Sequence, residues 1–89
     1  MATSKIRCDA SATKNVGTDL IISASEINTV DLDVSSNPSE YGLVKGFAIG
    51  NTERVAMVSC YFTAQNTIRV RCLNYASSTQ SAYITVFYI

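Results

Sequence analysis

The sequence TIRVRC, residues 67–72, decides the fold class of this chain. Its apolar residues alternate one by one with arginines. Because successive side chains of a β-strand point to opposite faces, this alternation is typical of a strand with one buried face and one face in water. The sequence TVDLDV, residues 29–34, repeats the pattern with aspartates in place of arginines. These two half-buried strands are the basis of the predicted fold class.

Similar short runs rich in β-branched and aromatic residues occur along the chain, and Gly, Asn, Pro and Ser separate them. The connections are too short for the crossover helices that a parallel sheet requires. The expected strands are 4–8, 18–24, 28–34, 42–50, 53–63, 66–74 and 81–89. We therefore predict an all-β chain: one small antiparallel β-sandwich or jelly-roll-like domain over residues 1–89, with about seven strands, ending in a C-terminal meander.

Composition excludes several classes of partner. The 89 residues carry seven basic and seven acidic side chains, for a formal net charge of zero. Nucleic-acid surfaces need a positive footprint, so we expect no nucleic-acid partner. No apolar run approaches the roughly 18 residues of a membrane span, so no membrane insertion is expected. The sequence MATSKIRCDASATK, residues 1–14, lacks a signal-peptide core, which predicts synthesis in a cytoplasm without Sec export.

The three cysteines are Cys8, Cys60 and Cys72. Their spacing matches no zinc pattern, and the chain contains no histidine. We interpret them as small buried apolar residues, with a Cys60–Cys72 bridge between neighbouring strands as the alternative. No metal and no cofactor are expected.

Catalytic chemistry is not indicated. Without histidine there is no His-based triad and no His general base. Asp31 and Asp33 share one strand face, but a solvated face explains them better than a paired-carboxylate site. Arg69 and Arg71 have the same spacing, so the four charges form either a cross-strand ladder or two independent solvated faces. We predict no catalytic residues and no enzymatic activity.

The sequence SAYITVFYI, residues 81–89, is apolar on both faces of the expected strand. Such a strand is either central and covered on both sides within the chain, or covered on one side by another copy. With 47% apolar residues in so short a chain, the second alternative gains weight. The candidate residues for an oligomer interface lie on one side of this strand or on the other: Ile84, Val86 and Tyr88, or Tyr83, Phe87 and Ile89.

Tyrosines and side-chain amides gather at or near the expected turns. A tyrosine beside Asn or Gln can stack on a sugar ring and bond its hydroxyls, whereas the alternative is ordinary turn chemistry with tyrosines at strand ends. The candidate glycan contacts are Tyr41, Asn51, Tyr61, Asn74 and Tyr75.

The sequence VSCYFTAQNTIRVRCLNYASSTQSAYITVFYI, residues 58–89, resembles the C-terminal β-modules of bacteriophage tail-fibre and receptor-binding proteins. The shared features are the strand IRVRCLNYASS, with an Asn and a Ser/Thr-rich turn, and a closing YITVFYI strand. The resemblance implies a homo-oligomer, with a trimer favoured, that packs one strand face toward its axis. It also implies a virion location and loops that meet a saccharide of the host surface.

The chain departs from that family by having no shaft repeats. The alternatives are a capsid-decorating or head-fibre protein without receptor binding, and a bacterial carbohydrate-binding or adhesion module.

Overall fold

The computed structural model describes residues 13–89, and these form six β-strands and no helix. The expected strand 4–8 lies outside the described residues. The strands are β1 (Lys14–Ile22), β2 (Ile27–Asp33), β3 (Val44–Gly50), β4 (Val55–Ala64), β5 (Thr67–Asn74) and β6 (Gln80–Tyr88). The predicted all-β class is confirmed for residues 13–89, which hold six strands.

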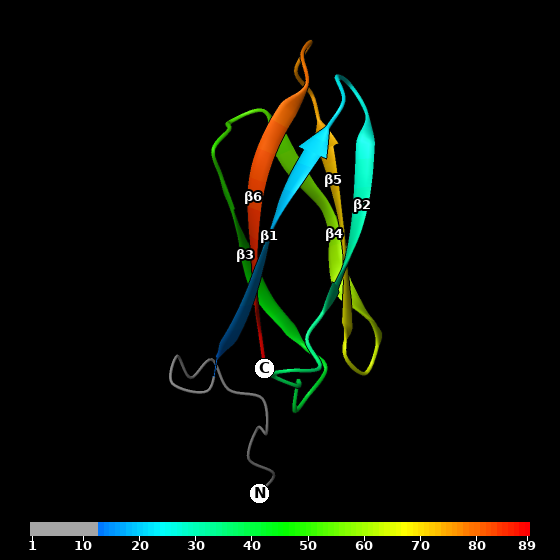
Figure 1. The fold of residues 1–89 in the computed structure, drawn as a ribbon, viewed down its shortest axis with the longest axis vertical. Helices are drawn as coiled ribbons and strands as arrows, with labels where there is room; N and C mark the ends of the chain where they lie inside the picture. Colours follow the sequence, from blue (N-terminus) through cyan, green and yellow to red (C-terminus); the bar gives the residue numbers. More distant parts are fainter. Residues whose placement is uncertain (1–12) are drawn as a thin grey trace, which may run out of the picture.

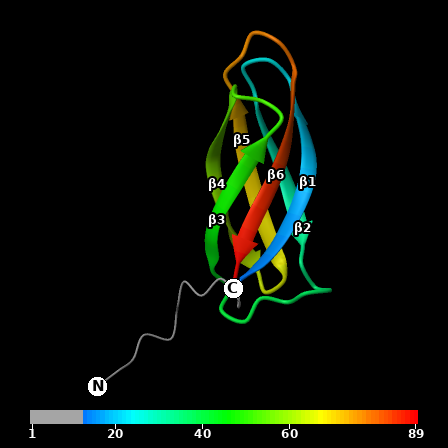
Figure 2. The same ribbon diagram turned by 90° about the vertical axis from the view of Figure 1, so that its left-hand side faces the viewer.

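The strands form two antiparallel sheets of three, which we name sheet A and sheet B. Sheet A has the order β1-β6-β3, and sheet B has the order β2-β5-β4. Figure 1 shows the two sheets as the two layers of a sandwich-like arrangement. In Figure 2 sheet A faces the viewer, with β6 between β3 and β1. Each sheet therefore has one central strand, and the other four strands are edges.

The predicted C-terminal meander is wrong. β4 and β5 pair as a hairpin, as expected, but β6 pairs with β1 and β3 in the other sheet. The segment 75–79 crosses from sheet B to sheet A. The physical reason is burial: both β5 and β6 carry apolar side chains on one continuous face, and each becomes the central strand of its own sheet. The alternation of apolar and polar residues identifies a strand, but it does not identify the strands that pair with it.

One hydrophobic core fills the space between the sheets. β5 and β6 contribute most of the wholly buried side chains, and the facing positions of β1, β2 and β4 complete it. The buried core residues are Leu20, Ile22, Leu32, Val34, Val55, Ile68, Val70, Cys72, Ala82, Ile84, Val86 and Tyr88. Phe62 closes the core through an edge-to-face contact with Tyr88, with ring centroids 5.9 Å apart.

The connections lie at two opposite ends. At the upper end of Figure 1 are the turn 23–26, the loop 51–54 and the loop 75–79, which we call the loop end. At the lower end are the segment 34–43, the hairpin turn 65–66 and Ile89. Any ligand surface built from loops must therefore use one end or the other.

Candidate binding surfaces

The inward side of β6 is covered by its own chain. Ile84, Val86 and Tyr88 are wholly or almost wholly buried in the core between the sheets. Ile89 is also buried: its amide donates to the Leu43 carbonyl, and its own carbonyl accepts from the amides of Tyr41 and Leu43. The chain's own contacts therefore cover these four residues of the predicted interface.

The outward side of β6 carries an aromatic ridge made of Tyr83 and Phe87. Tyr83 is 42% exposed, and Phe87 is partly exposed. The Tyr83 ring leans over β1 at Gly17, where an added Cβ would lie 2.2 Å from the Tyr83 hydroxyl oxygen. Only a glycine at position 17 leaves room for the Tyr83 ring in this place. These two residues are the part of the predicted interface that a partner can reach.

On the other flank of the ridge, β3 presents small residues. The outward positions of β3 paired with β6 are Gly46, Ala48 and Gly50. No atom lies within 4 Å of a Cβ built at Gly46. The outer face of sheet A therefore has aromatic rings on β6 beside small residues on β3, with open space over Gly46. From the sequence, Gly46 and Gly50 were considered only as a phosphate loop, which was rejected, although small residues at positions 46, 48 and 50 of the expected strand 42–50 were a visible signal.

Charge distinguishes this face from its counterpart on sheet B. Among the outward strand positions that pair in sheet A, Asp19 is the only charged residue, and Lys45 lies at the bulge of β3, where its Nζ donates to the Thr13 hydroxyl. The outer face of sheet B carries Arg69, Arg71, Asp31 and Asp33. The sandwich-like fold therefore has one charged face and one that is nearly uncharged.

Of the two alternatives for the four charges of sheet B, a ladder or independent solvated faces, the ladder forms at one position and not at the other. Arg69 donates from Nε and Nη2 to the two carboxylate oxygens of Asp31, at 2.9 and 3.1 Å. These bonds lower the pKa of Asp31 and raise that of Arg69. Asp33 instead accepts from the hydroxyl and amide of Ser35, which lower its pKa. Both partners of the ion pair are exposed, so it fixes side-chain positions more than it stabilises the fold.

Asn74 holds the loop end together from the inside. Its side chain is 0% exposed, and its Nδ2 donates to the carbonyls of Ile22, Ser23 and Ser78 at 2.9–3.3 Å. Its Oδ1 accepts from the Ala76 amide at 2.8 Å. The side chain thus joins the turn after β1 to the loop before β6. Asn74 was a candidate glycan contact, but the structure places it where no part of it reaches the surface.

Tyr75 is the exposed aromatic residue of the loop end, at 54%. Its amide donates to the Arg54 carbonyl, and its hydroxyl donates to the Glu53 carbonyl. These bonds hold the ring against the loop 51–54, where Asn51 is exposed and has a positive φ of 75°. Two of the candidate glycan contacts, Asn51 and Tyr75, therefore share one end of the molecule.

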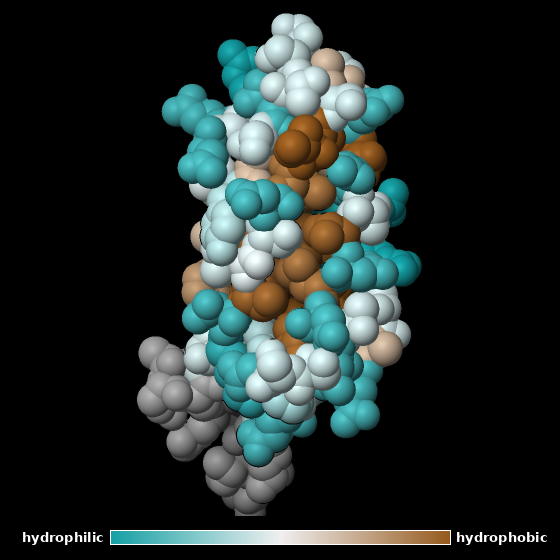
Figure 3. All heavy atoms as spheres, in the orientation of Figure 1, coloured by the Kyte–Doolittle hydropathy of each residue, from teal (hydrophilic) through white to brown (hydrophobic). Residues whose placement is uncertain are grey.

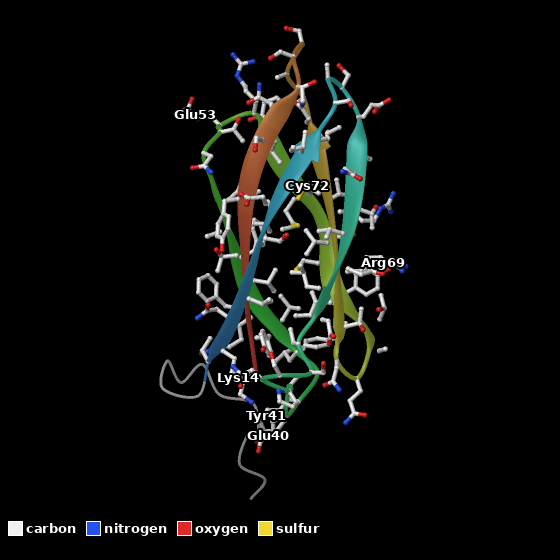
Figure 4. All side chains as sticks on the ribbon, viewed as in Figure 1. Lys14, Glu40, Tyr41, Glu53, Arg69 and Cys72 are labelled. Carbon is white, nitrogen blue, oxygen red and sulfur yellow. The ribbon has the colours of Figure 1, made fainter. Side chains whose placement is uncertain are left out.

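The remaining two candidates lie elsewhere. Tyr41 is at the opposite end from Glu53, as Figure 4 shows. Tyr61 is on the outer face of sheet B, directly opposite Arg69 on β5. The five candidate glycan contacts therefore do not form one site, and the loop end is the only place where two of them come together on the surface of the described chain.

A line of apolar side chains marks the seam between the two sheets. Figure 3 shows hydrophobic residues along the junction of β1 and β2, where the edges of the sheets meet. Ile21 and Ile27 are exposed on either side of the turn 23–26, while Val16 and Val30 are half-buried. No contact within the described chain shows what would cover this seam.

Within residues 13–89, no group of three or more His, Cys, Asp or Glu side chains is placed to hold a metal ion. The described residues also contain no helix with the length and apolar character needed to cross a membrane. Cys60 and Cys72 are both free thiols. No protein-family model, curated protein or solved structure matches this chain.

Proposed function

We propose that this chain is a non-enzymatic structural and attachment module of a phage virion, built as a β-sandwich. Copies associate through the outer face of sheet A, with a trimer as the favoured state, and the loop end meets a saccharide of the host surface. The observation that carries the proposal is the contrast between the two outer faces. One is nearly uncharged and bears an aromatic ridge, whereas the other carries charges of both signs.

Subunit contact through sheet A is favoured by the free energy of burying each outer face. Covering sheet B would remove Arg71 and Asp33 from water, and neither has an ion-pair partner within residues 13–89, so their burial is costly. Covering sheet A would bury the exposed parts of Tyr83 and Phe87. Burying a wholly exposed Phe contributes about 1.5–3 kcal/mol, so each of these partly buried rings contributes less. The open space over Gly46 gives a partner's aromatic ring a place to pack.

Saccharide recognition at the loop end rests on Tyr75. Its exposed ring is fixed by main-chain bonds to the neighbouring loop, so stacking on a sugar costs little ordering. Exposed polar groups of Asn51 and Arg54 lie in the adjoining loop. A single shallow platform binds weakly, and repetition around an oligomer axis raises the avidity.

The mass of the protein in solution tests the oligomer. Light scattering after size exclusion should give a multiple of 9.6 kDa, near threefold. Tyr83→Lys should yield a monomer. Tyr61→Lys is the matched control, because Tyr61 is a strand tyrosine of similar exposure, 47%, on the outer face of sheet B. A monomeric wild type, or equal effects of the two variants, would overturn the interface.

Glycan-array binding of the assembled protein tests the attachment role. Tyr75→Ala should abolish the signal, while Tyr41→Ala at the opposite end should leave it unchanged. A stable oligomer that binds no saccharide would favour a capsid-decorating or head-fibre protein. Binding by a monomer would favour a bacterial carbohydrate-binding or adhesion module.

A further inference from the structure

The pairing of β4 with β5 continues by one residue into the loop end. Val55 and Asn74 form the last pair of the two strands, and both side chains are buried. Beyond them the Tyr75 amide donates to the Arg54 carbonyl at 3.0 Å, which sets these two residues opposite each other. Because successive side chains of a strand point to opposite faces, Arg54 and Tyr75 lie on the outer side of sheet B.

Two rows of outward side chains follow this pair along the outer face of sheet B. The first row is apolar and spans all three strands; it consists of Ile27, Leu73 and Ala56. Ile27 is 47% exposed, so the apolar row is open to water. The second row has the exposed Arg71 on the central strand. Tyr75, Leu73 and Arg71 therefore follow one another at intervals of about 6.6 Å. We call Arg54, Tyr75 and these two rows the sheet-B platform.

The positive charge of the platform is not compensated within residues 13–89. Neither Arg54 nor Arg71 has an ion-pair partner there, whereas Arg69, one row further along, is paired with Asp31. Figure 4 shows Arg69 pointing away from the interior on this side of the molecule. The two rows of the platform contain no acidic side chain. The platform therefore combines an exposed aromatic ring, an apolar row and two unpaired cations.

We propose that the sheet-B platform binds an acidic oligosaccharide, one that contains uronic acid. The proposal rests on the saccharide role of the loop end and names the kind of saccharide. One face of a sugar ring presents C–H groups, which pack on the Tyr75 ring and the apolar row. The carboxylate of the sugar accepts two parallel hydrogen bonds from the planar guanidinium of Arg71. Arg54 adds a second positive charge beside the Tyr75 ring.

Arg71 favours an acidic ligand over a neutral one because no acid of the described chain occupies it. Arg69 already donates to both carboxylate oxygens of Asp31, so a ligand would have to compete with that pair. At Arg71 a carboxylate gains charge-assisted hydrogen bonds without displacing anything. Since Arg71 is exposed, salt screens this attraction, and binding of the acid should weaken as the ionic strength rises.

The platform stays accessible in the proposed assembly. Copies that associate through the outer face of sheet A leave the outer face of sheet B, on the other side of the sandwich, in contact with water. Each copy then presents one platform. A polysaccharide with repeated acidic units can contact several platforms at once, which raises the avidity.

The test compares matched ligands on the assembled wild-type protein. The probe is an array of oligosaccharides that contain uronic acid, each printed beside its carboxyl-reduced neutral form. The acidic form should bind about tenfold more tightly or better, because hydrogen bonds to charged groups are the stronger ones. Equal binding of the two forms would overturn the acidic ligand while the saccharide role of the loop end stands. Binding of no saccharide at all would overturn both.

Two arginine variants test the position of the acid, with affinities from calorimetric titration of the best pair of ligands. Arg71→Gln should weaken binding of the acidic form about tenfold and leave the neutral form unchanged. Arg69→Gln is the matched control, because it removes the same charge from the same face of β5. It should change neither affinity by more than about twofold. Equal losses in the two variants would mean that net charge attracts the ligand, and would overturn the site.

Discussion

Replacing Asn74 with Ala should be among the most destabilising single changes at the loop end. Two of its bonds are fully buried, the one to the Ile22 carbonyl and the one from the Ala76 amide. Each buried group left without a partner costs about 1–3 kcal/mol, so the two together destabilise the fold by about 2–6 kcal/mol. For a chain of this size, the lower value corresponds to a fall in Tm of about 8 °C or more.

A matched control isolates the effect of burial. Asn28 donates from Nδ2 to the Ile21 carbonyl at 2.9 Å, the same length as the bond from Asn74 to the Ile22 carbonyl, but it is exposed. Because water replaces the lost partner, Asn28→Ala should cost about 1 kcal/mol or less. Urea unfolding followed by circular dichroism gives both values on one scale. If the two variants lost equal stability, Asn74 would not be holding the loop end together.

Three further changes have definite expected outcomes. Tyr88→Phe removes a hydrogen bond of 2.6 Å to the Asn37 carbonyl and should lower the free energy of unfolding in urea by about 1 kcal/mol. Because burial raises the pKa of Tyr88, this difference in stability between wild type and variant should disappear as the pH rises through the folded pKa. Asp31→Asn should destabilise at neutral pH but converge with the wild type in acid, since the bond with Arg69 lowers the Asp31 pKa and its stabilisation disappears as the pH falls through that value; urea midpoints that stay equally far apart in acid would contradict this. Gly17→Ala should push the Tyr83 ring off β1 while the fold survives, because the clash is with the far end of a flexible side chain; unchanged nuclear magnetic resonance shifts of that ring would refute it.

Fold class was predictable because alternation in residues 29–34 and 67–72 reports directly on a half-buried strand. Which strands pair with one another was not predictable, because an apolar strand such as β6 fits any buried position in a sheet. The two apolar sides of the strand 81–89 gave two alternatives. The structure shows a central strand whose inward side is covered within the chain, while Tyr83 and Phe87 remain outside.

The candidate site residues show the same limit. Tyr75 could be identified because a tyrosine beside a turn is usually exposed, and it is. Asn74, one residue earlier, has the same local context and yet is buried, since its amide completes bonds to segments about 50 residues away in the chain. The inward position of both Met57 and Cys60 on β4 was hidden for a different reason. The spacing of Met57 and Cys60 indicates opposite faces, and only the bulge at Val58 reverses that.

The placement of β6 at the centre of sheet A has a consequence for how the chain folds. Lys14 pairs with Tyr88, so the first described strand finds its neighbour only in the last one. During synthesis, β1 and β3 must wait without a partner until β6 leaves the ribosome, whereas the β4–β5 hairpin closes locally. Pairings of such long range are slow, on the order of milliseconds to seconds. For that interval the unpaired edges are exposed to aggregation, and a chaperone that holds the nascent chain would raise the yield of folded protein.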